Sequence, residues 1–217
     1  MIINKKNIIN AVGASVLLLV VLGGFFATGY MTKKIEDDER SNLLLRAQMI
    51  AVLIDTNALS RLSGTTSDMI TPEYGAIKSA LERVHALNTD SRFVYISGLR
   101  DDNQFFYVDA ENPSSPDFSP AGQIYPEATQ IDKENFSQKI PYTKGPYTDS
   151  YGTWFTAYAP IMSADGVIRE IGIDIDANKL LLRIAIVRQA TIIIFSLIFL
   201  ALLSVFVLVR KSVVDEG

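Results

Sequence analysis

Aromatic and acidic side chains recur at every second position of several segments in the second half of the chain. Side chains two residues apart lie on the same face of a β-strand, so pairing of these strands would gather them on one face of a sheet. Aromatic rings supply apolar walls, and carboxylates orient a bound molecule. Acidic rather than basic groups favour a cationic or hydroxyl-bearing ligand. The candidate ligand-binding residues are Tyr95, Tyr107, Asp109, Trp154, Tyr158 and Asp174.

The same alternation has a second interpretation. The opposite face of these strands would carry side chains that are typical of a protein core: Val94, Ile96, Phe106, Val108, Phe155, Ile171, Ile173 and Ile175. The six candidates would then form an ordinary second core layer, with tyrosine hydroxyls satisfied at its edge. Both interpretations stay open on the residues alone.

The sequence shows little sign of catalysis or metal binding. No nucleophile elbow, phosphate-binding loop or Ser/His/Asp set stands out, so we expect a protein that is not an enzyme. The chain has no cysteine and a single histidine, His85, so we expect no metal site and no cofactor. Residues 174–178 imitate the start of a calcium loop, but Lys179 and Ala185 stand where that loop requires Gly and Glu.

Two stretches without a charged residue enclose the segment that carries the candidates. They contain 26 and 21 residues, and each exceeds the ~20 residues needed to cross a hydrocarbon core of ~30 Å. We therefore expect membrane spans at 8–32 and 189–209, with the lipid bilayer as a partner and an outer domain at 33–188. The alternative for the first span is a cleaved signal peptide, although its apolar run is longer than the usual core of about 7–15 residues.

Basic residues precede the first span and follow the second. The positive-inside rule then puts residues 1–7 and 210–217 in the cytoplasm and the outer domain in a periplasm or outside the cell. We expect a two-pass protein of the inner (cytoplasmic) membrane. Residues 33–188 contain 16 Lys and Arg against 22 Asp and Glu, a net charge of −6, which disfavours nucleic acid as a partner.

The elements that must position the candidates follow from breaker residues and periodicity. Residues 35–62 contain no Gly or Pro and predict one long helix with two apolar stripes, either deeply buried or shared with a dimer partner. Thr71 before Pro72 predicts the start of a second helix. The period then changes to two, which predicts antiparallel strands over 93–97 and 104–109, joined around 98–103.

The remaining segments complete one α+β domain. We expect a lid or a packed loop at 112–126, a short helix at 131–138, and a hairpin of strands 153–162 and 167–176 joined at Asp165-Gly166. A final helix leads into the second span. The order predicts a single antiparallel sheet with helices largely on one face.

Several of these segments resemble the extracytoplasmic Cache (PAS-like) sensor domains of bacterial receptors. The resemblance covers about residues 35–185 and is carried by 92–95, 108–109, 116–122, 145–154, 159–161 and 172–176. Its most specific part is Gly-Pro-Tyr-Thr-Asp followed by Gly-Thr-Trp, within 145–154. Domains of this family lie between two membrane spans in sensor histidine kinases, chemoreceptors and diguanylate cyclases.

The resemblance implies a small-molecule pocket on the sheet face away from the long helix, and signalling as a homodimer through the membrane helices. The class of ligand stays open, but an amino acid is not supported, because Gly152 stands where the amino-acid-binding pattern has Arg two residues before Trp154. The chain ends seven residues after Arg210, so we expect the output module to be absent. The alternative function is a membrane-anchored regulatory or assembly protein whose outer domain binds another protein.

Overall fold

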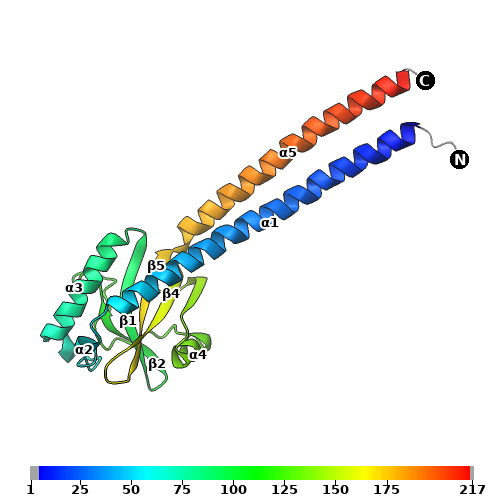
Figure 1. Cartoon of the computed structure of the whole chain (residues 1–217). Helices are drawn as coiled ribbons and strands as arrows, with labels where there is room; N and C mark the ends of the chain where they lie inside the picture. The colour runs from blue at the N-terminus through cyan, green and yellow to red at the C-terminus, as the bar shows by residue number, and fades with distance from the viewer. Residues whose placement is uncertain (1–4, 216–217) are drawn as a thin grey trace. The chain divides into compact units, whose positions relative to one another are not determined.

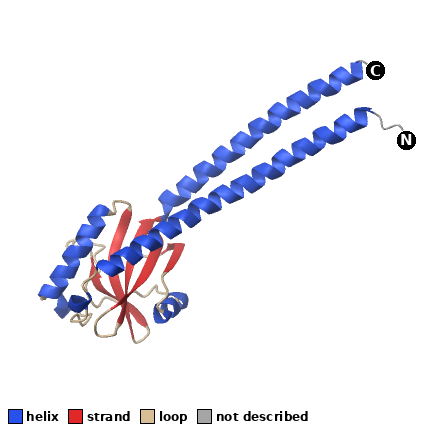
Figure 2. Ribbon diagram, viewed as in Figure 1, coloured by secondary structure: helices blue, strands red, loops and turns tan. Residues whose placement is uncertain are grey.

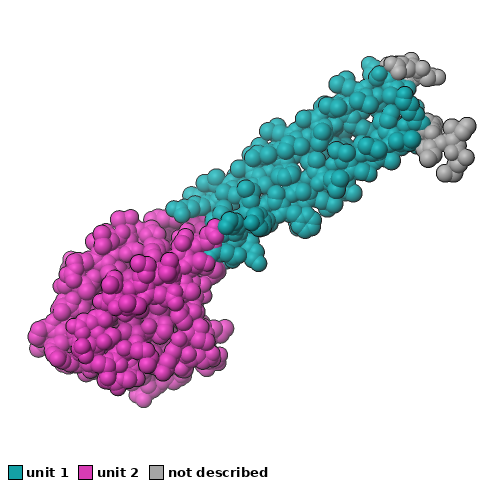
Figure 3. Space-filling view, in the orientation of Figure 1, with its two compact units in different colours: residues 1–37, 181–217 teal, residues 38–180 magenta. Residues whose placement is uncertain are grey.

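The computed structural model describes residues 5–215, and the chain divides into two compact units (Figure 3). One unit is a domain formed by Asp38–Leu180, and the other comprises the described parts of residues 1–37 and 181–217. Helix α1 (Lys5–Leu53) begins in the second unit and ends in the domain, and helix α5 (Ala177–Asp215) begins in the domain. The expected cytoplasmic segments 1–7 and 210–217 lie partly outside the described residues.

Helices α1 and α5 are both long and apolar enough to cross a membrane. The expected spans 8–32 and 189–209 fall within them. Their packing depends on glycine: a Cβ on Gly13 would lie 2.2 Å from the Phe206 ring, and a Cβ on Gly24 would lie 2.9 Å from the Phe195 ring. Since 13 pairs with 206 and 24 with 195, the two helices run antiparallel.

The domain is built on one antiparallel sheet of five strands, in the spatial order β2-β1-β5-β4-β3 (Figure 1). The strands are β1 (Ser91–Arg100), β2 (Asn103–Asp109), β3 (Tyr142–Thr148), β4 (Thr153–Met162) and β5 (Ile168–Asp176). The predicted α+β fold with a single antiparallel sheet is confirmed.

Both predicted hairpins are confirmed, and each has a tight turn. In the β4–β5 hairpin, Gly166 has φ +77°, a conformation that favours glycine. The β1–β2 hairpin turns at Asp101 and Asp102, which have φ values of 49° and 61°. The predicted connection at 98–103 is thus too long, because strand pairing continues to Arg100 and Asn103.

One face of the sheet is covered by α1 and by helix α3 (Pro72–Leu87), which lies beside β1 and β2 (Figure 2). The predicted start of α3 is confirmed, since the Thr71 hydroxyl accepts a hydrogen bond from the Tyr74 N–H and Pro72 is the first helical residue. This face forms the aliphatic core. Its buried side chains include Leu43, Ala47, Ile50, Ile77, Leu81, Val94, Ile96, Val108, Phe155, Ile171, Ile173 and Ile175.

The predicted long helix over 35–62 is wrong at its end. Helix α1 stops at Leu53, and Asp55 caps a separate short helix, α2 (Thr56–Leu59), by accepting hydrogen bonds from the N–H groups of Asn57 and Ala58. Aspartate offers the backbone such a bond, and a cap therefore interrupts a segment that lacks Gly and Pro. A 3-10 helix, η1 (Thr66–Ile70), leads from there to α3.

Strand β3 was not predicted from the sequence. Gly145-Pro146 interrupts its pattern, and proline is rare in central strands. In the structure β3 is an edge strand, and its register with β4 shifts between Lys144 and Tyr147 so that pairing resumes beyond the proline. The predicted short helix is confirmed as α4 (Gln130–Gln138), which is capped by Thr129.

The segment 112–126 is a packed loop. Its end runs along the outer edge of β2, where the Gly122 N–H donates to the Phe106 carbonyl at 2.8 Å and the Tyr125 N–H donates to the Gln104 carbonyl at 2.8 Å. The Phe106 N–H in turn donates to the Gln123 carbonyl at 3.0 Å. The loop therefore satisfies backbone groups of β2 that no strand covers.

Candidate functional site

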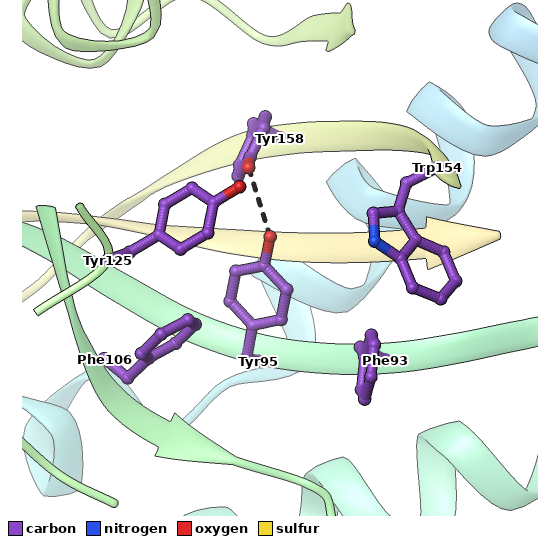
Figure 4. Packing of buried hydrophobic residues seen from close by; sticks show 6 residues of the cluster. All are labelled: Phe93, Tyr95, Phe106, Tyr125, Trp154 and Tyr158. Atoms are coloured by element: carbon purple, nitrogen blue, oxygen red, sulfur yellow. Dashed lines mark hydrogen bonds between the residues drawn. The ribbon is translucent and has the colours of Figure 1, made fainter. Parts of the chain in front are cut away.

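A cluster of buried aromatic rings lies on the other face of the sheet (Figure 4). Its members are Phe93, Tyr95, Phe106, Tyr125, Trp154 and Tyr158. The Phe93 and Trp154 rings meet edge to face with centroids 5.2 Å apart, and so do the rings of Tyr95 and Phe106. Because Arg40 of α1 stacks on Phe155, the neighbour of Trp154 in β4, the cluster lies on the face away from α1.

Gly172 in the central strand β5 makes room for the ring of Tyr95. A Cβ at this position would lie 2.4 Å from that ring. The Tyr95 hydroxyl can therefore reach across the sheet, where it donates to the Tyr158 hydroxyl at 3.1 Å and lies 3.5 Å from Oδ1 of Asp174. The absence of a side chain at Gly172 thus allows the Tyr95 hydroxyl to approach the buried carboxyl of Asp174.

The cluster encloses a cavity of about 30 Å³. This is room for about two water molecules, whereas pockets for metabolites are usually about 300–1,000 Å³. A larger ligand therefore requires side chains at the cavity to move. The lining residues are Phe93, Tyr95, Gln104, Phe106, Asp109, Asp117, Ser119, Tyr125, Tyr147, Asp149, Tyr151, Trp154 and Asp174.

Four carboxyl groups line the cavity, and no Lys or Arg is among these lining residues. Asp174 accepts a hydrogen bond from the Thr156 hydroxyl, which also contacts the Tyr147 hydroxyl at 2.9 Å. Asp109 accepts from two backbone N–H groups, those of Glu111 and Ser119, at 2.9 and 2.8 Å. The cavity is accordingly acidic.

Burial disfavours the charged form of the deepest carboxyls. Asp174 is 5% exposed, and desolvation raises its pKa from 3.8 to about 7. Burial also raises the pKa of Asp109, against the effect of its two backbone hydrogen bonds. Glu170, on the same face of β5, accepts from Gln104 and Ser97, and burial raises its pKa to about 8.

Two loops at the cavity contact each other through hydrogen bonds. The Gln123 side chain, from the packed loop, donates to the Tyr151 hydroxyl at 2.9 Å. The Tyr125 hydroxyl donates to Asp149 at 2.8 Å, and the indole N–H of Trp154 donates to the other oxygen of Asp149 at 2.9 Å. The bonds between Gln123 and Tyr151 and between Tyr125 and Asp149 therefore connect the packed loop to the segment between β3 and β4.

No protein-family model matches the sequence, and no curated protein is significantly similar to it. Solved structures do share its fold. An extracellular ligand-binding receptor from Desulfohalobium retbaense DSM5692 matches with a TM-score of 0.50 at 10% identity, over 75% of this chain and 27% of the other. The Cache-like fold that the sequence predicted is thus confirmed.

Two structures of a chemoreceptor sensory domain are also similar to this chain. The sensory domain of Campylobacter jejuni Tlp3 matches with a TM-score of 0.49 at 16% identity, over 76% of this chain and 64% of the other. The same domain with isoleucine bound matches with a TM-score of 0.46 at 15% identity, over 84% and 68%. This chain thus spans about a quarter of the Desulfohalobium receptor and slightly less than two thirds of the first Tlp3 structure.

Four of the six predicted ligand-binding residues line the cavity: Tyr95, Asp109, Trp154 and Asp174. Tyr158 lies behind them. It is 1% exposed, it is bonded to the Tyr95 hydroxyl, and its ring stacks on Tyr142 with centroids 4.8 Å apart. Ligand binding by these residues stays a prediction.

Tyr107 does not line the cavity, and Phe106, predicted for the core face, does. The cause is a bulge: Ile96 pairs with Val108 but Ser97 pairs with Phe106, so one residue of β2 is skipped. Tyr107 instead packs beside Phe105 and under the guanidinium of Arg169. The predicted alternation therefore fails in β2 from this point.

Sequence reasoning also missed several lining residues. Phe93 lies two residues before Tyr95 on the same strand, so the alternation itself could have identified it. Tyr147, Asp149 and Tyr151 belong to the segment 145–154, which carries the most specific part of the Cache resemblance. Without β3 in the predicted sheet, nothing placed these three side chains at the cavity.

We predict that the stability of the domain falls as the pH rises from 5 to 8. The folded state keeps protons on Asp174 and Glu170 in a range where the unfolded chain has already lost them. Each such group lowers the free energy of unfolding by about 1.4 kcal/mol per pH unit between its two pKa values. Asp174→Asn should remove a third to a half of this slope, as measured by chemical denaturation at several pH values.

Asp101→Asn, in the exposed β1–β2 turn, is the control for this measurement. Three other acids have lowered pKa values: Glu73, Glu111 and Asp165. Their effect on the free energy of unfolding changes with pH only below about pH 5, outside the range that is measured. A slope that is equally steep in Asp174→Asn and in the unsubstituted protein would contradict a protonated Asp174.

Proposed function

We propose that this chain is the ligand-sensing part of a transmembrane receptor, and that it binds a small molecule outside the membrane. The observation that carries the proposal is the aromatic-lined cavity with its buried Asp174, which contacts no Lys or Arg among the described residues, within a fold that a known extracellular ligand-binding receptor shares. Aromatic rings together with a few convergent polar groups are the usual composition of a ligand pocket. The proposed role is binding, with no catalytic step.

The signal would pass through α1 and α5, the two candidate membrane helices. A contact from the cavity to α1 supports this route. Arg40 of α1 donates to the carbonyl of Gly145 in β3, two residues before the lining residue Tyr147, and its guanidinium lies 4.7 Å from the Phe155 ring centroid, beside Trp154. A ligand that moves β3 or β4 would therefore act on α1 directly.

A second copy of the chain is the proposed partner. Beyond the buried stripe of α1, three of its apolar side chains, spaced as one helix face, are exposed: Leu45 by 55%, Met49 by 58% and Val52 by 84%. Exposed apolar side chains on one helix face are unfavourable in water. A parallel pairing of two α1 helices would bury all three. Both copies would then place their α1 helices side by side.

The test of the function is a thermal-shift screen of residues 34–187 against small amines, acids, sugars and divalent ions. A ligand at 100 times its dissociation constant stabilises the folded state by about 2.7 kcal/mol, which raises the melting temperature by several degrees. Trp154→Ala should abolish the shift, and Leu87→Ala, an exposed residue of α3, should keep it. If no class of compound raises the melting temperature of the well-folded domain, the alternative function is favoured, in which the outer domain binds another protein.

Arg40→Ala tests the route to α1. With a ligand from the screen, we expect an affinity within about threefold of the unsubstituted protein, because Arg40 does not line the cavity. The ligand-induced change in hydrogen exchange over residues 38–53 should be lost. The control is Arg46→Ala, also on α1, which removes an ion pair with Asp90. This variant should keep the ligand-induced change in hydrogen exchange.

If the domain is a dimer, its mass in solution should be that of two chains. Substitutions on the exposed face of α1 should then weaken self-association, and substitutions elsewhere should not. Val52→Glu introduces a charge into the proposed interface and should weaken self-association at least tenfold, as measured by sedimentation equilibrium. Ile70→Glu, at a position that is 92% exposed outside α1, should leave it unchanged. Equal effects of both substitutions would contradict an interface on α1.

A further inference from the structure

A groove runs between α1 and α5 along the two candidate membrane spans. It is lined by side chains from residues 20–32 of α1 and 188–200 of α5, all within one compact unit, and it has a volume of about 770 Å³. A helical segment of this length is about 18 Å long. The groove therefore follows the half of each span that adjoins the domain.

The groove exists because the two helices touch unevenly. They are in contact at Gly24, which lies against the Phe195 ring, and again where the Thr191 hydroxyl lies 3.5 Å from the sulfur of Met31. Gly29 lies between these levels and also lines the groove, but a Cβ at this position would meet no atom within 4 Å. The space over Gly29 is therefore open.

The hydroxyl groups in the groove are satisfied by their own helix. The Thr28 hydroxyl donates to the Gly24 carbonyl at 2.7 Å, and the Thr32 hydroxyl contacts the carbonyls of Thr28 and Gly29 at 3.0 and 3.1 Å. In hydrocarbon an unsatisfied polar group is costly, and these two hydroxyls have already used their protons. With walls such as the Phe199 ring, the groove thus presents a mainly apolar surface.

One cation lines the groove, at the end that adjoins the domain. Arg188 directly precedes the expected second span, and it forms no ion pair or hydrogen bond with any of the described residues. A long basic side chain at the end of a span reaches the level of the lipid headgroups. A guanidinium binds a phosphate through two parallel N–H···O bonds, so Arg188 matches the charged part of a phospholipid.

The dimensions and the charge of the groove favour a lipid over a second copy of the chain. The mean cross-section of the groove is about 40 Å², which is too narrow for a helix that is 10–12 Å across but admits acyl chains. A second copy packed in parallel would also bring its own Arg188 to the same depth, and the two like charges would repel. A lipid phosphate would instead neutralise Arg188.

We propose that this groove binds one anionic phospholipid from the leaflet next to the domain, with its acyl chains over Gly29 and its phosphate on Arg188. The inference does not depend on the aromatic cavity or its ligand, and it requires only that α1 and α5 cross the membrane. Acyl chains gain packing here but no hydrophobic driving force, since the surrounding lipid is equally apolar. The charge of Arg188 therefore decides which headgroup is preferred.

The test is native mass spectrometry of the full chain in detergent micelles, titrated with phosphatidylglycerol or with phosphatidylcholine of the same acyl chains. We expect one retained phosphatidylglycerol per chain, bound at least fivefold more tightly than phosphatidylcholine. Arg188→Gln should remove this preference. Arg210→Gln, near the other end of α5 and outside the groove, is the matched control and should keep it.

Gly29→Leu tests the apolar part of the site. The new side chain would fill the open space in the groove and should weaken the binding of both lipids at least fivefold. Gly75→Leu in α3, where a Cβ likewise meets no atom within 4 Å, is the control and should leave lipid binding unchanged. Far-ultraviolet circular dichroism checks that both variants are folded. If Gly29→Leu does not fold, the lipid preference and the two arginine variants decide alone.

Three results would overturn the proposal. The first is equal binding of the two lipids, or an equal effect of Arg188→Gln and Arg210→Gln, because the preference would then not arise at Arg188. The second is unchanged lipid binding by folded Gly29→Leu. The third is a lipid-free dimer that Gly29→Leu separates into single chains, because a second copy would then occupy the groove.

Discussion

The two faces of strand β5 carry opposite chemistry, and the rest of the domain depends on this. Ile171, Ile173 and Ile175 point toward the helices and are buried in the aliphatic core. Glu170, Gly172 and Asp174 point to the other side, between β1 and β4. Because β5 is the central strand, a charge-bearing group on its second face can be satisfied only by what neighbouring strands and loops supply. In this domain, hydroxyl groups, aromatic rings and the side-chain amide of Gln104 surround these groups.

The aromatic face thus combines apolar walls with buried polar groups. Its tyrosines contribute both surfaces at once, since their rings pack edge to face and their hydroxyls bond to one another or to carboxyls. Burial raises the pKa of Tyr95 and Tyr158 far above the usual value, so these hydroxyls remain donors at any physiological pH.

Periodicity predicted the fold well because the hairpins of β1–β2 and β4–β5 combine strict alternation with clear turn residues. It predicted the site less well, for local reasons. The bulge opposite Ile96 and Ser97 exchanged Tyr107 for Phe106, and a bulge depends on packing that a single strand does not reveal. Gly145-Pro146 hid β3, and with it the side chains that complete the cavity. The cap at Asp55 likewise ended a helix that periodicity alone would continue.

The loop that runs along β2 has a consequence for how these domains behave at high local concentration. Exposed sheet edges invite strand addition from other chains, which leads to polymers. The bonds of Gly122, Gln123 and Tyr125 occupy the β2 edge, so no foreign strand can dock there without displacing the loop. At the opposite edge, Pro146 in β3 lacks the N–H that a continuous ladder needs. The sheet is thus protected from extension at both of its sides.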